Sequence, residues 1–304
     1  MARAAANVSG LQFAMSIPER NLKRTDNEFL PVYDMYALSA DEVLLACGYA
    51  GVRALSLHTT QLAAHDPTAI RHVYRAAFEA HTDTLLLFVK SPTDEYSQLV
   101  SLRRNASEWL EVQRLNISLR AYTQYKSGKL GFNRRASISV CDSRVLLFER
   151  GGNTLYVFDV NAEHTLHYAG YVTQQTAMYG LVCTRRVNDT LVAFSHERTS
   201  VSLHRLASLP LRLEPLARVD LTDPHPFLLF RGDLLLVVDF NSHTDLTDIV
   251  SLRVSGNALT ERRVLLDAQA GVHVAFWALA GDRLVLWDGK SKDQGPVAPK
   301  YTSY

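Results

Sequence analysis

Short apolar runs recur along the chain, and each follows directly on a turn that contains an aspartate. Successive aspartates are separated by 42, 59, 47, 44 and 49 residues. A repeat of this length matches one four-stranded antiparallel sheet, about 40 to 50 residues, and is too long for the coil of a leucine-rich solenoid. The six copies are Asp41-Glu-Val-Leu-Leu-Ala, Asp83-Thr-Leu-Leu-Leu-Phe, Asp142-Ser-Arg-Val-Leu-Leu-Phe, Asp189-Thr-Leu-Val-Ala-Phe, Asp233-Leu-Leu-Leu-Val-Val and Asp282-Arg-Leu-Val-Leu-Trp.

Most copies divide into four strand-like segments. We expect strands over 225–231, 234–239, 248–254 and 259–266 in the fifth copy, and over 178–184, 191–195, 200–206 and 211–219 in the fourth. The third segments alternate apolar with polar residues, which is typical of strands with one packed face. The second segments are almost continuously apolar, which indicates burial on both faces. Helical periodicity is nowhere sustained, so the sequence predicts an all-β fold.

The recurring aspartate has a structural interpretation. Gly-Asp, Asn-Asp and Ala-Asp pairs between two apolar strands are the residues that tight hairpin turns require. A ring of carboxylates around a metal ion would be the alternative, but residues at turns do not point into a common centre. We therefore predict that these aspartates shape the hairpins.

Six sheets that each need neighbours on both faces favour closure into a ring, because a ring removes exposed sheet edges. The sixth copy is incomplete, since residues 290–304 are polar and contain two prolines. The alternating segment 11–17 is a candidate for a closing strand donated to the last sheet; truncation from a longer parent is the alternative. The predicted organisation is an N-terminal segment over 1–28, the repeat domain over 29–293 and an irregular tail over 294–304.

In period and strand pattern the chain resembles the β-propeller repeat superfamily, of the Trp-Asp-repeat and YVTN kinds. The closest local match is Thr154-Leu-Tyr-Val-Phe-Asp-Val160, and the resemblance covers about residues 30 to 290. The chain departs from the Trp-Asp pattern because Trp287-Asp288 ends a second strand and no Gly-His signature occurs. The resemblance implies a six-bladed propeller, a rigid disc whose top face and rim bind proteins, peptides or small molecules.

Composition excludes several classes of protein. A chain of 304 residues that is 47% hydrophobic and 21% charged is large enough to bury a core, and its net charge of +1 gives no overall attraction to nucleic acid. The apolar runs are too short to span a membrane, and the N-terminus lacks the apolar segment of a secretory signal. We expect a cytoplasmic monomer whose three cysteines, at irregular spacing, are free thiols.

The sequence offers no catalytic residue, metal site or cofactor motif. Nucleophile elbows, phosphate-binding glycine loops and zinc-binding helices of the His-Glu-X-X-His type are all absent. The rival hypothesis is a cation-dependent small-molecule hydrolase or lactonase of propeller fold. Asp239, Asn241 and Glu197 follow second strands and are the residues that would hold its cation.

The longest interval between copies has a distinct composition. Residues 114–135 carry six cations and no acid, with aromatic residues between them. Long loops on rigid scaffolds concentrate binding residues, and cations beside aromatics suit acidic peptides. We predict a non-enzymatic interaction scaffold whose partner is a protein or an acidic peptide; the net charge does not favour nucleic acid. The candidate binding residues are Arg120, Tyr122, Tyr125, Lys126, Lys129, Phe132, Arg134 and Arg135.

Overall fold

A computed structural model gives the structure of the protein. It describes residues 23–25, 28–29, 32–59, 61–63, 66–90, 97–106, 108–117, 136–186, 189–196, 200–221, 224–241, 246–266, 274–281, 283–288 and 301–303. Every regular element in these ranges is a β-strand, and every pairing is antiparallel. The all-β prediction is confirmed. Among the described segments, none is a helix with the length and apolar character needed to cross a bilayer.

The strands group into sheets in the order of the sequence. The first sheet holds β3 (Asp34–Ala37), β4 (Glu42–Ala46), β5 (Val52–Ser56) and β6 (Gln61–Leu62). The second holds β7 (Val73–Glu79), β8 (Thr84–Lys90), β9 (Ser97–Asn105) and β10 (Glu108–Ile117). A small separate hairpin, β1 (Lys23–Thr25) and β2 (Glu28–Phe29), precedes them.

The next sheet is continuous over seven strands. It contains β11 (Ala136–Cys141), β12 (Arg144–Glu149), β13 (Gly152–Val160), β14 (Leu166–Arg186), β15 (Asp189–His196), β16 (Ser200–Ser208) and β17 (Leu211–Asp220). It is followed by the sheet of β18 (Pro224–Arg231), β19 (Leu234–Asn241), β20 (Leu246–Ser255) and β21 (Ala258–Leu266). The last sheet consists of β22 (Val274–Ala280), β23 (Arg283–Asp288) and β24 (Tyr301–Ser303).

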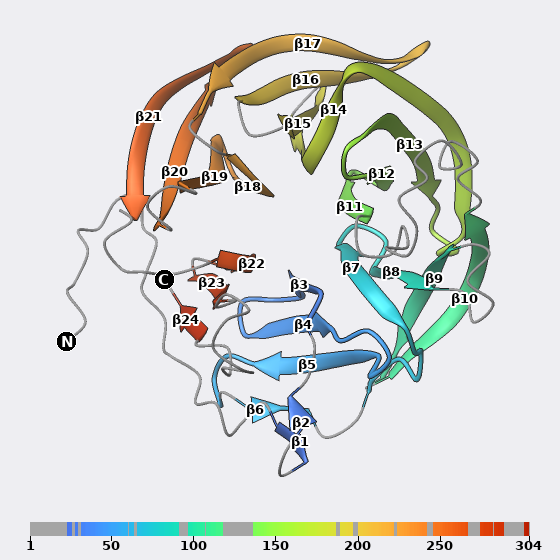
Figure 1. Cartoon of the computed structure of the whole chain (residues 1–304). Helices are drawn as coiled ribbons and strands as arrows, with labels where there is room; N and C mark the ends of the chain where they lie inside the picture. Colours follow the sequence, from blue (N-terminus) through green and yellow to red (C-terminus); the bar gives the residue numbers. More distant parts are fainter. Residues whose placement is uncertain are drawn as a thin grey trace, which may run out of the picture.

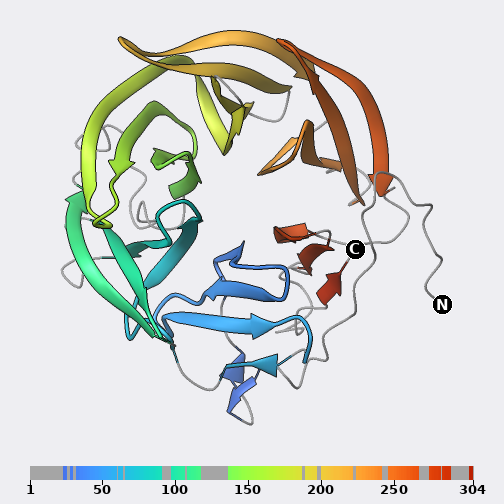
Figure 2. The ribbon, with the colours of Figure 1, turned by 180° about the vertical axis from the view of Figure 1, so that it is seen from behind.

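The sheets stand side by side around a common centre, as both faces of the molecule show (Figures 1 and 2). The strands nearest the centre are β3, β7, β11, the second half of β14, β18 and β22, and all of them line a central cavity. Later strands of each sheet lie progressively farther out. The first and last sheets are neighbours, so the chain returns to its starting point.

The strand predictions for the fifth copy agree with β18 to β21 to within two residues. The predicted burial of the second strands is confirmed as well, since β8 and β15 are buried over nearly their whole length. One difference concerns β14, which the sequence divides between two copies. Residues 166–173 pair with β13 and residues 178–186 with β15. The intervening Gln174-Gln-Thr-Ala177 contains no glycine or proline, so no turn-forming residue separates the two halves of this strand.

The hairpin prediction holds for Asp83, Asp142 and Asp233, which lie in turns, and Asp41 lies in the bend before β4. Asp189 is instead the first residue of β15, and Asp282 lies outside the described residues. Asp83 and Asp142 lie in turns at φ values of 53° each, and Ser143 follows at 58°. Positive φ at the central residues is the conformation that two-residue hairpins need, and aspartate tolerates it. The carboxylates also pair with arginines at the surface: Asp142 pairs with Arg185, and Asp189 lies 3.0 Å from Arg205.

The hydrophobic core is divided among the spaces between sheets. Four of the clusters of buried side chains join consecutive sheets, and a fifth joins the two halves of the seven-stranded sheet. The sixth cluster closes the ring by joining the first sheet to the last. In this closing cluster Val43 and Leu45 of β4 pack with Ala278, Ala280 and Val285 of β22 and β23. Packing of apolar faces therefore holds the first and last sheets together, and among the described strands none of the first sheet pairs with one of the last.

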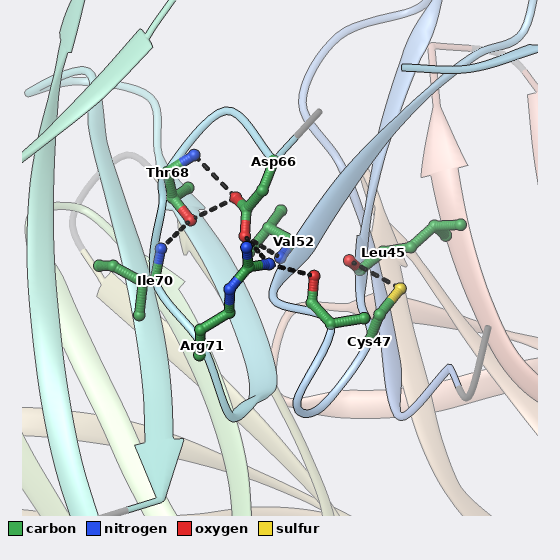
Figure 3. Close-up of polar contacts among 8 residues, drawn as sticks. Leu45, Cys47, Val52, Asp66, Thr68, Ile70 and Arg71 are labelled. Carbon is green, nitrogen blue, oxygen red and sulfur yellow. Dashed lines mark hydrogen bonds and ion pairs between the residues drawn. The ribbon is translucent and has the colours of Figure 1, made fainter. Parts of the chain in front are cut away.

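A buried carboxylate fixes the connection between the first and second sheets (Figure 3). Asp66 accepts hydrogen bonds from the Thr68 N–H at 2.8 Å, the Thr68 hydroxyl at 2.7 Å and the Val52 N–H at 3.2 Å, and it pairs with Arg71 at 3.7 Å. Gly51 makes room for it, because a Cβ there would collide with the Asp66 carboxylate, and its φ of 79° suits glycine.

The third described strand of the last sheet, β24, comes from the C-terminal end of the chain. Strand β24 pairs with β23 through Val285 with Ser303, Leu286 with Thr302 and Trp287 with Tyr301. Within the stretch predicted as an irregular tail, 294–304, the structure describes only residues 301–303, which form β24. The candidate closing strand 11–17 lies outside the described residues, so its role stays a prediction.

A polar network is enclosed between β15 and β16. Ser202 lies 2.5 Å from His196 Nε2 and 2.9 Å from His204 Nε2, and His196 Nδ1 lies 3.2 Å from the Ala177 carbonyl. Because a carbonyl only accepts, His196 Nδ1 donates to it and His196 Nε2 accepts from the Ser202 hydroxyl. His204 then donates to Ser202 through Nε2. Because its Nε2 accepts, His196 is neutral. His204 can donate through Nε2 in either protonation state, but its buried Nδ1 has no hydrogen-bond partner among the described residues, so a second proton there would have no acceptor.

We expect Leu45→Ala to lower the free energy of unfolding by about 2 to 5 kcal/mol, because it opens a cavity in the cluster that closes the ring. Arg283→Gln is the control: it removes the exposed pair between Arg283 and Asp41, 3.4 Å apart at the same junction, and should cost less than about 1 kcal/mol. Urea denaturation measures both. Equal losses would contradict closure by apolar packing.

Stability should fall in mild acid because of the two histidines. Burial, and then the charge of His196, lower the pKa of His204 from 6.5 to about 4, and burial also lowers the pKa of His196. The unfolded chain takes up these protons near pH 6.5, so the stabilisation is complete above that pH and is lost as the pH falls toward 4. His204 alone accounts for about 3 kcal/mol. Denaturation measured between pH 4 and 8 should show a smaller loss in His204→Gln, and identical pH profiles would refute the assignment.

Candidate functional site: a cavity at the centre of the ring

A cavity of about 290 Å³ occupies the centre of the ring. Its walls come from the innermost strand of every sheet, together with the turn after β12. Several lining side chains are only partly buried, so solvent reaches the cavity. This position, where separate elements converge on one enclosed space, is where ring-shaped folds bind ligands.

Charge is concentrated on one side of the cavity. Asp34 begins β3, Arg75 lies near the start of β7, and Arg150 occupies the turn between β12 and β13. The innermost strands run in the same direction, so the beginnings of β3 and β7 lie at the same end of the ring. Among the described lining residues Asp34 is the single carboxylate, facing two guanidinium groups. The part of the lining that the structure describes therefore carries one more positive than negative charge.

Hydrogen bonds to the backbone hold this cluster in place. Arg75 donates from Nη1 to the carbonyl of Tyr74 at 2.9 Å and to that of Tyr33. The Ala76 N–H donates to Asp34 Oδ2 at 3.3 Å. Arg150 donates from Nε to the Ser137 hydroxyl, also at 3.3 Å. Neighbouring sheets are thus connected through charged side chains as well as through their apolar faces.

The protonation equilibria reflect both burial and proximity. Burial raises the pKa of Asp34, against the lowering effect of the Arg75 charge and the Ala76 N–H. Burial lowers the pKa of Arg75, and Asp34 opposes that change. Burial, and then the charge of Arg75, lower the pKa of Arg150 to about 9. At neutral pH both guanidinium groups are charged, and they repel each other.

The opposite side of the cavity is largely apolar. Leu181 of β14, Leu229 and Phe230 of β18, and Leu279 of β22 contribute most of it. Trp277 of β22 also lines the cavity and is 4% exposed. Its indole N–H has no hydrogen-bond partner among the described residues. A buried N–H donor without an acceptor is unfavourable, by roughly 1 to 3 kcal/mol, so this group favours a ligand with an acceptor atom.

Two cysteines lie at or near the cavity. Cys183 lines it, with its sulfur 3.3 Å from the Ser139 hydroxyl oxygen, and Cys141 forms a hydrogen bond with Cys183. A hydrogen bond to Cys183, together with burial, raises the pKa of Cys141 well above its usual value. All three cysteines are free, as the sequence predicts, and burial raises the pKa of Cys47 to about 12. A protonated buried thiol is unreactive.

The binding residues that the sequence singles out, from Arg120 to Arg135, lie outside the described residues. Arg114, at the start of that cationic stretch, is described: it belongs to β10 and pairs with Glu111 at 2.6 Å and with Gln98 at 2.6 Å. Of the residues named for a cation site, Asp239 lies 3.7 Å from Arg262 and is not part of the cavity lining. The side chains of Asn241 and Glu197 are also outside the described set.

No family model matches the sequence, and no curated protein matches it. Solved structures do. A protein from Lactobacillus plantarum has a TM-score of 0.56 at 14% identity, with 83% of this chain and 79% of that chain covered. The β-propeller domain of Cps50 (Swd1) from Myceliophteria thermophila has a TM-score of 0.52 at 11% identity, with 90% and 83% covered. The fold is a β-propeller.

A third propeller-like neighbour is a putative oxidoreductase (glucose dehydrogenase) from Thermus thermophilus. Its TM-score is 0.57 at 10% identity, with 90% of this chain and 96% of that chain covered. At such identities the likeness extends to the fold alone, so the chemistry of this propeller has to be argued from its own side chains.

The sequence analysis missed the charged cluster of the propeller. A signal for it was present: Asp34 and Arg75 interrupt first strands that are otherwise apolar or aromatic, Val32-Tyr-Asp-Met-Tyr-Ala37 and Val73-Tyr-Arg-Ala-Ala-Phe78. The side chain of an ionisable residue in the innermost strand of a blade reaches solvent most readily through the central channel. Arg150 was harder to find, because it follows a second strand and resembles an ordinary turn residue.

We expect the charged cluster to reduce the stability of the propeller. Arg150→Met removes the positive charge in excess and should leave the free energy of unfolding unchanged or raise it by about 1 kcal/mol. Asp34→Asn leaves two guanidinium groups unbalanced and should lower it by roughly 1 to 3 kcal/mol. Urea denaturation at pH 7 measures both changes. A large loss in Arg150→Met together with none in Asp34→Asn would contradict this charge balance.

Proposed function

We propose that the chain is a six-bladed propeller that acts as a non-enzymatic scaffold for a protein partner, and that the partner presents an acidic peptide segment to the centre of the ring. The blades are β3–β6, β7–β10, β11–β13 with the first half of β14, the second half of β14 with β15–β17, β18–β21, and β22–β24. The cavity charge carries the proposal: two arginines face one carboxylate in a partly desolvated space, where an anionic group of the partner would balance them.

The rigidity of the ring supports a scaffold. Buried apolar clusters join the first sheet to the second, the second to the seven-stranded sheet, and the two halves of the seven-stranded sheet to each other, so Arg75 and Arg150 are held in fixed positions before any partner arrives. Preorganised cations bind an anion with less loss of conformational entropy than flexible surface lysines do. We propose that the same acidic segment of the partner also contacts the cationic insertion over 114–135.

The sign of the charge argues against the rival hydrolase. A divalent cation at the centre of a propeller requires several oxygen ligands of negative charge. Among the described residues, no group of three or more His, Cys, Asp or Glu side chains is placed to hold a metal ion. At the centre itself Arg75 and Arg150 would repel a cation, and the Asp34 carboxylate alone cannot balance it.

Binding of an acidic peptide tests the proposal. A fluorescent hexaglutamate peptide with an amidated C-terminus should bind the protein, and fluorescence anisotropy should show weaker binding as salt is added. Arg150→Met should lower the affinity about tenfold or more, because it removes a charge-assisted hydrogen bond. The double variant Arg134→Glu and Arg135→Glu should lower it further.

The matched control is the double variant Arg218→Glu and Arg263→Glu. These two exposed arginines lie on β17 and β21, away from the cavity lining, and their reversal changes the net charge by the same amount. It should change the affinity less than twofold. If all three variants weakened binding equally, the peptide would be responding to net charge only, and the proposed site would be wrong. Absence of binding to the unmodified protein would also reject the proposal.

A further inference from the structure

The central cavity is divided into a charged and an apolar half. Arg75 and Arg150 come from the side of β7 and the turn after β12, while Leu181, Leu229 and Phe230 come from β14 and β18. A ligand that fits both halves carries its negative charge at one end and an apolar group close to it. A glutamate side chain meets the first requirement and leaves the apolar wall uncovered.

The charge balance favours a single negative charge. Among the lining residues that the structure describes, two guanidinium groups and one carboxylate leave an excess of one positive charge. A monocarboxylate neutralises that excess, whereas a phosphate monoester, with nearly two charges at neutral pH, would leave the site negative beside the Asp34 carboxylate. The carboxylate also has two oxygens that accept parallel hydrogen bonds from a guanidinium group.

The indole N–H of Trp277 indicates independently that the ligand carries a hydrogen-bond acceptor. Trp277 lines the cavity, it is 4% exposed, and its indole N–H has no partner among the described residues. Trp277 lies on β22, and its ring packs with Leu236 and Leu284 between the last two sheets. An acceptor that enters between the two halves of the cavity satisfies this donor while its negative charge is balanced by the arginines.

The small size of the cavity limits what enters. Its volume of about 290 Å³ is at the lower end of the range for ligand sites, roughly 300 to 1,000 Å³. A folded segment or a helix does not fit into such a space. The end of an extended chain does, and its last residue carries a carboxylate and a side chain on the same carbon.

We propose that the cavity binds the carboxyl terminus of the partner chain, with the terminal carboxylate at Arg75 and Arg150 and an apolar last side chain against Leu181, Leu229 and Phe230. This inference rests on the proposed scaffold function and specifies the group that the partner inserts. Asp34 then excludes a second negative charge from the charged half, so the site selects a free terminus with one carboxylate in the cavity.

Paired peptides that differ in one group test the inference. The labelled peptide Glu-Glu-Glu-Glu-Leu with a free C-terminus is compared with its C-terminal amide by fluorescence anisotropy at constant ionic strength. The free acid should bind at least about tenfold more tightly, because the amide loses the charge-assisted hydrogen bonds. Replacing the last leucine by serine in the free acid should lower the affinity several-fold.

Two variants locate the effect in the cavity. Arg150→Met should remove most of the difference between acid and amide, and Trp277→Phe, which keeps the ring and loses the N–H, should weaken the acid about threefold to tenfold and leave the amide unchanged. Arg262→Met, on the surface of β21, is the control and should preserve the full difference. Circular dichroism of each variant confirms that it has folded.

The outcomes separate this inference from the proposed function. If the acid and amide peptides bind equally and Arg150→Met weakens both, the scaffold function stands and recognition of the terminus is wrong. If neither binds, both proposals are wrong. Inorganic phosphate at matched ionic strength should not compete with the free acid, and competition at millimolar phosphate would overturn the selection for a single charge.

Discussion

The structure depends on one constraint: each sheet has two apolar faces, and each face has to be covered by another sheet. Antiparallel sheets whose second strands are apolar on both sides, such as β8 and β15, are not stable alone, and stacking them in sequence leaves the first and the last with one bare face each. The cluster of Leu45 with Ala278 and Val285 covers both bare faces at once, because it brings β4 against β22 and β23. Ring closure is therefore a consequence of burial, and the small C-terminal strand β24 adds to a junction that side-chain packing has already made.

Closure has a chemical consequence at the centre. The innermost strands approach one another there, and side chains on their inward faces share a small space that water reaches incompletely. Most of these side chains are apolar, but β3, β7 and the turn after β12 bring Asp34, Arg75 and Arg150 together. Burial lowers the pKa of Arg150 to about 9 and raises that of Asp34, so the cluster is held at a cost in stability. Residues that destabilise the fold in a preorganised cavity are typical of binding sites.

The sequence was sufficient to predict the all-β fold and the strands of the fifth copy, and insufficient to predict the site. The fifth copy could be divided correctly because Gly232-Asp233 and the period of two mark its strands, and both signals are local. The continuous strand β14 could not be foreseen, since nothing local tells whether Gln174 to Ala177 turns or continues. The cavity joins Asp34 to Arg150, more than 100 residues apart, and this proximity arises only when the ring closes. The cationic insertion attracted attention because its charges are adjacent in sequence, whereas the charges of the cavity are adjacent only in space.

A crystal structure of the protein grown with the free-acid peptide Glu-Glu-Glu-Glu-Leu would test the account most directly. The account predicts a closed ring of six blades with a carboxylate bound between Arg75 and Arg150, and with the leucine side chain against Phe230. An open ring, or a peptide bound elsewhere with a metal ion at the centre beside Asp34, would contradict it.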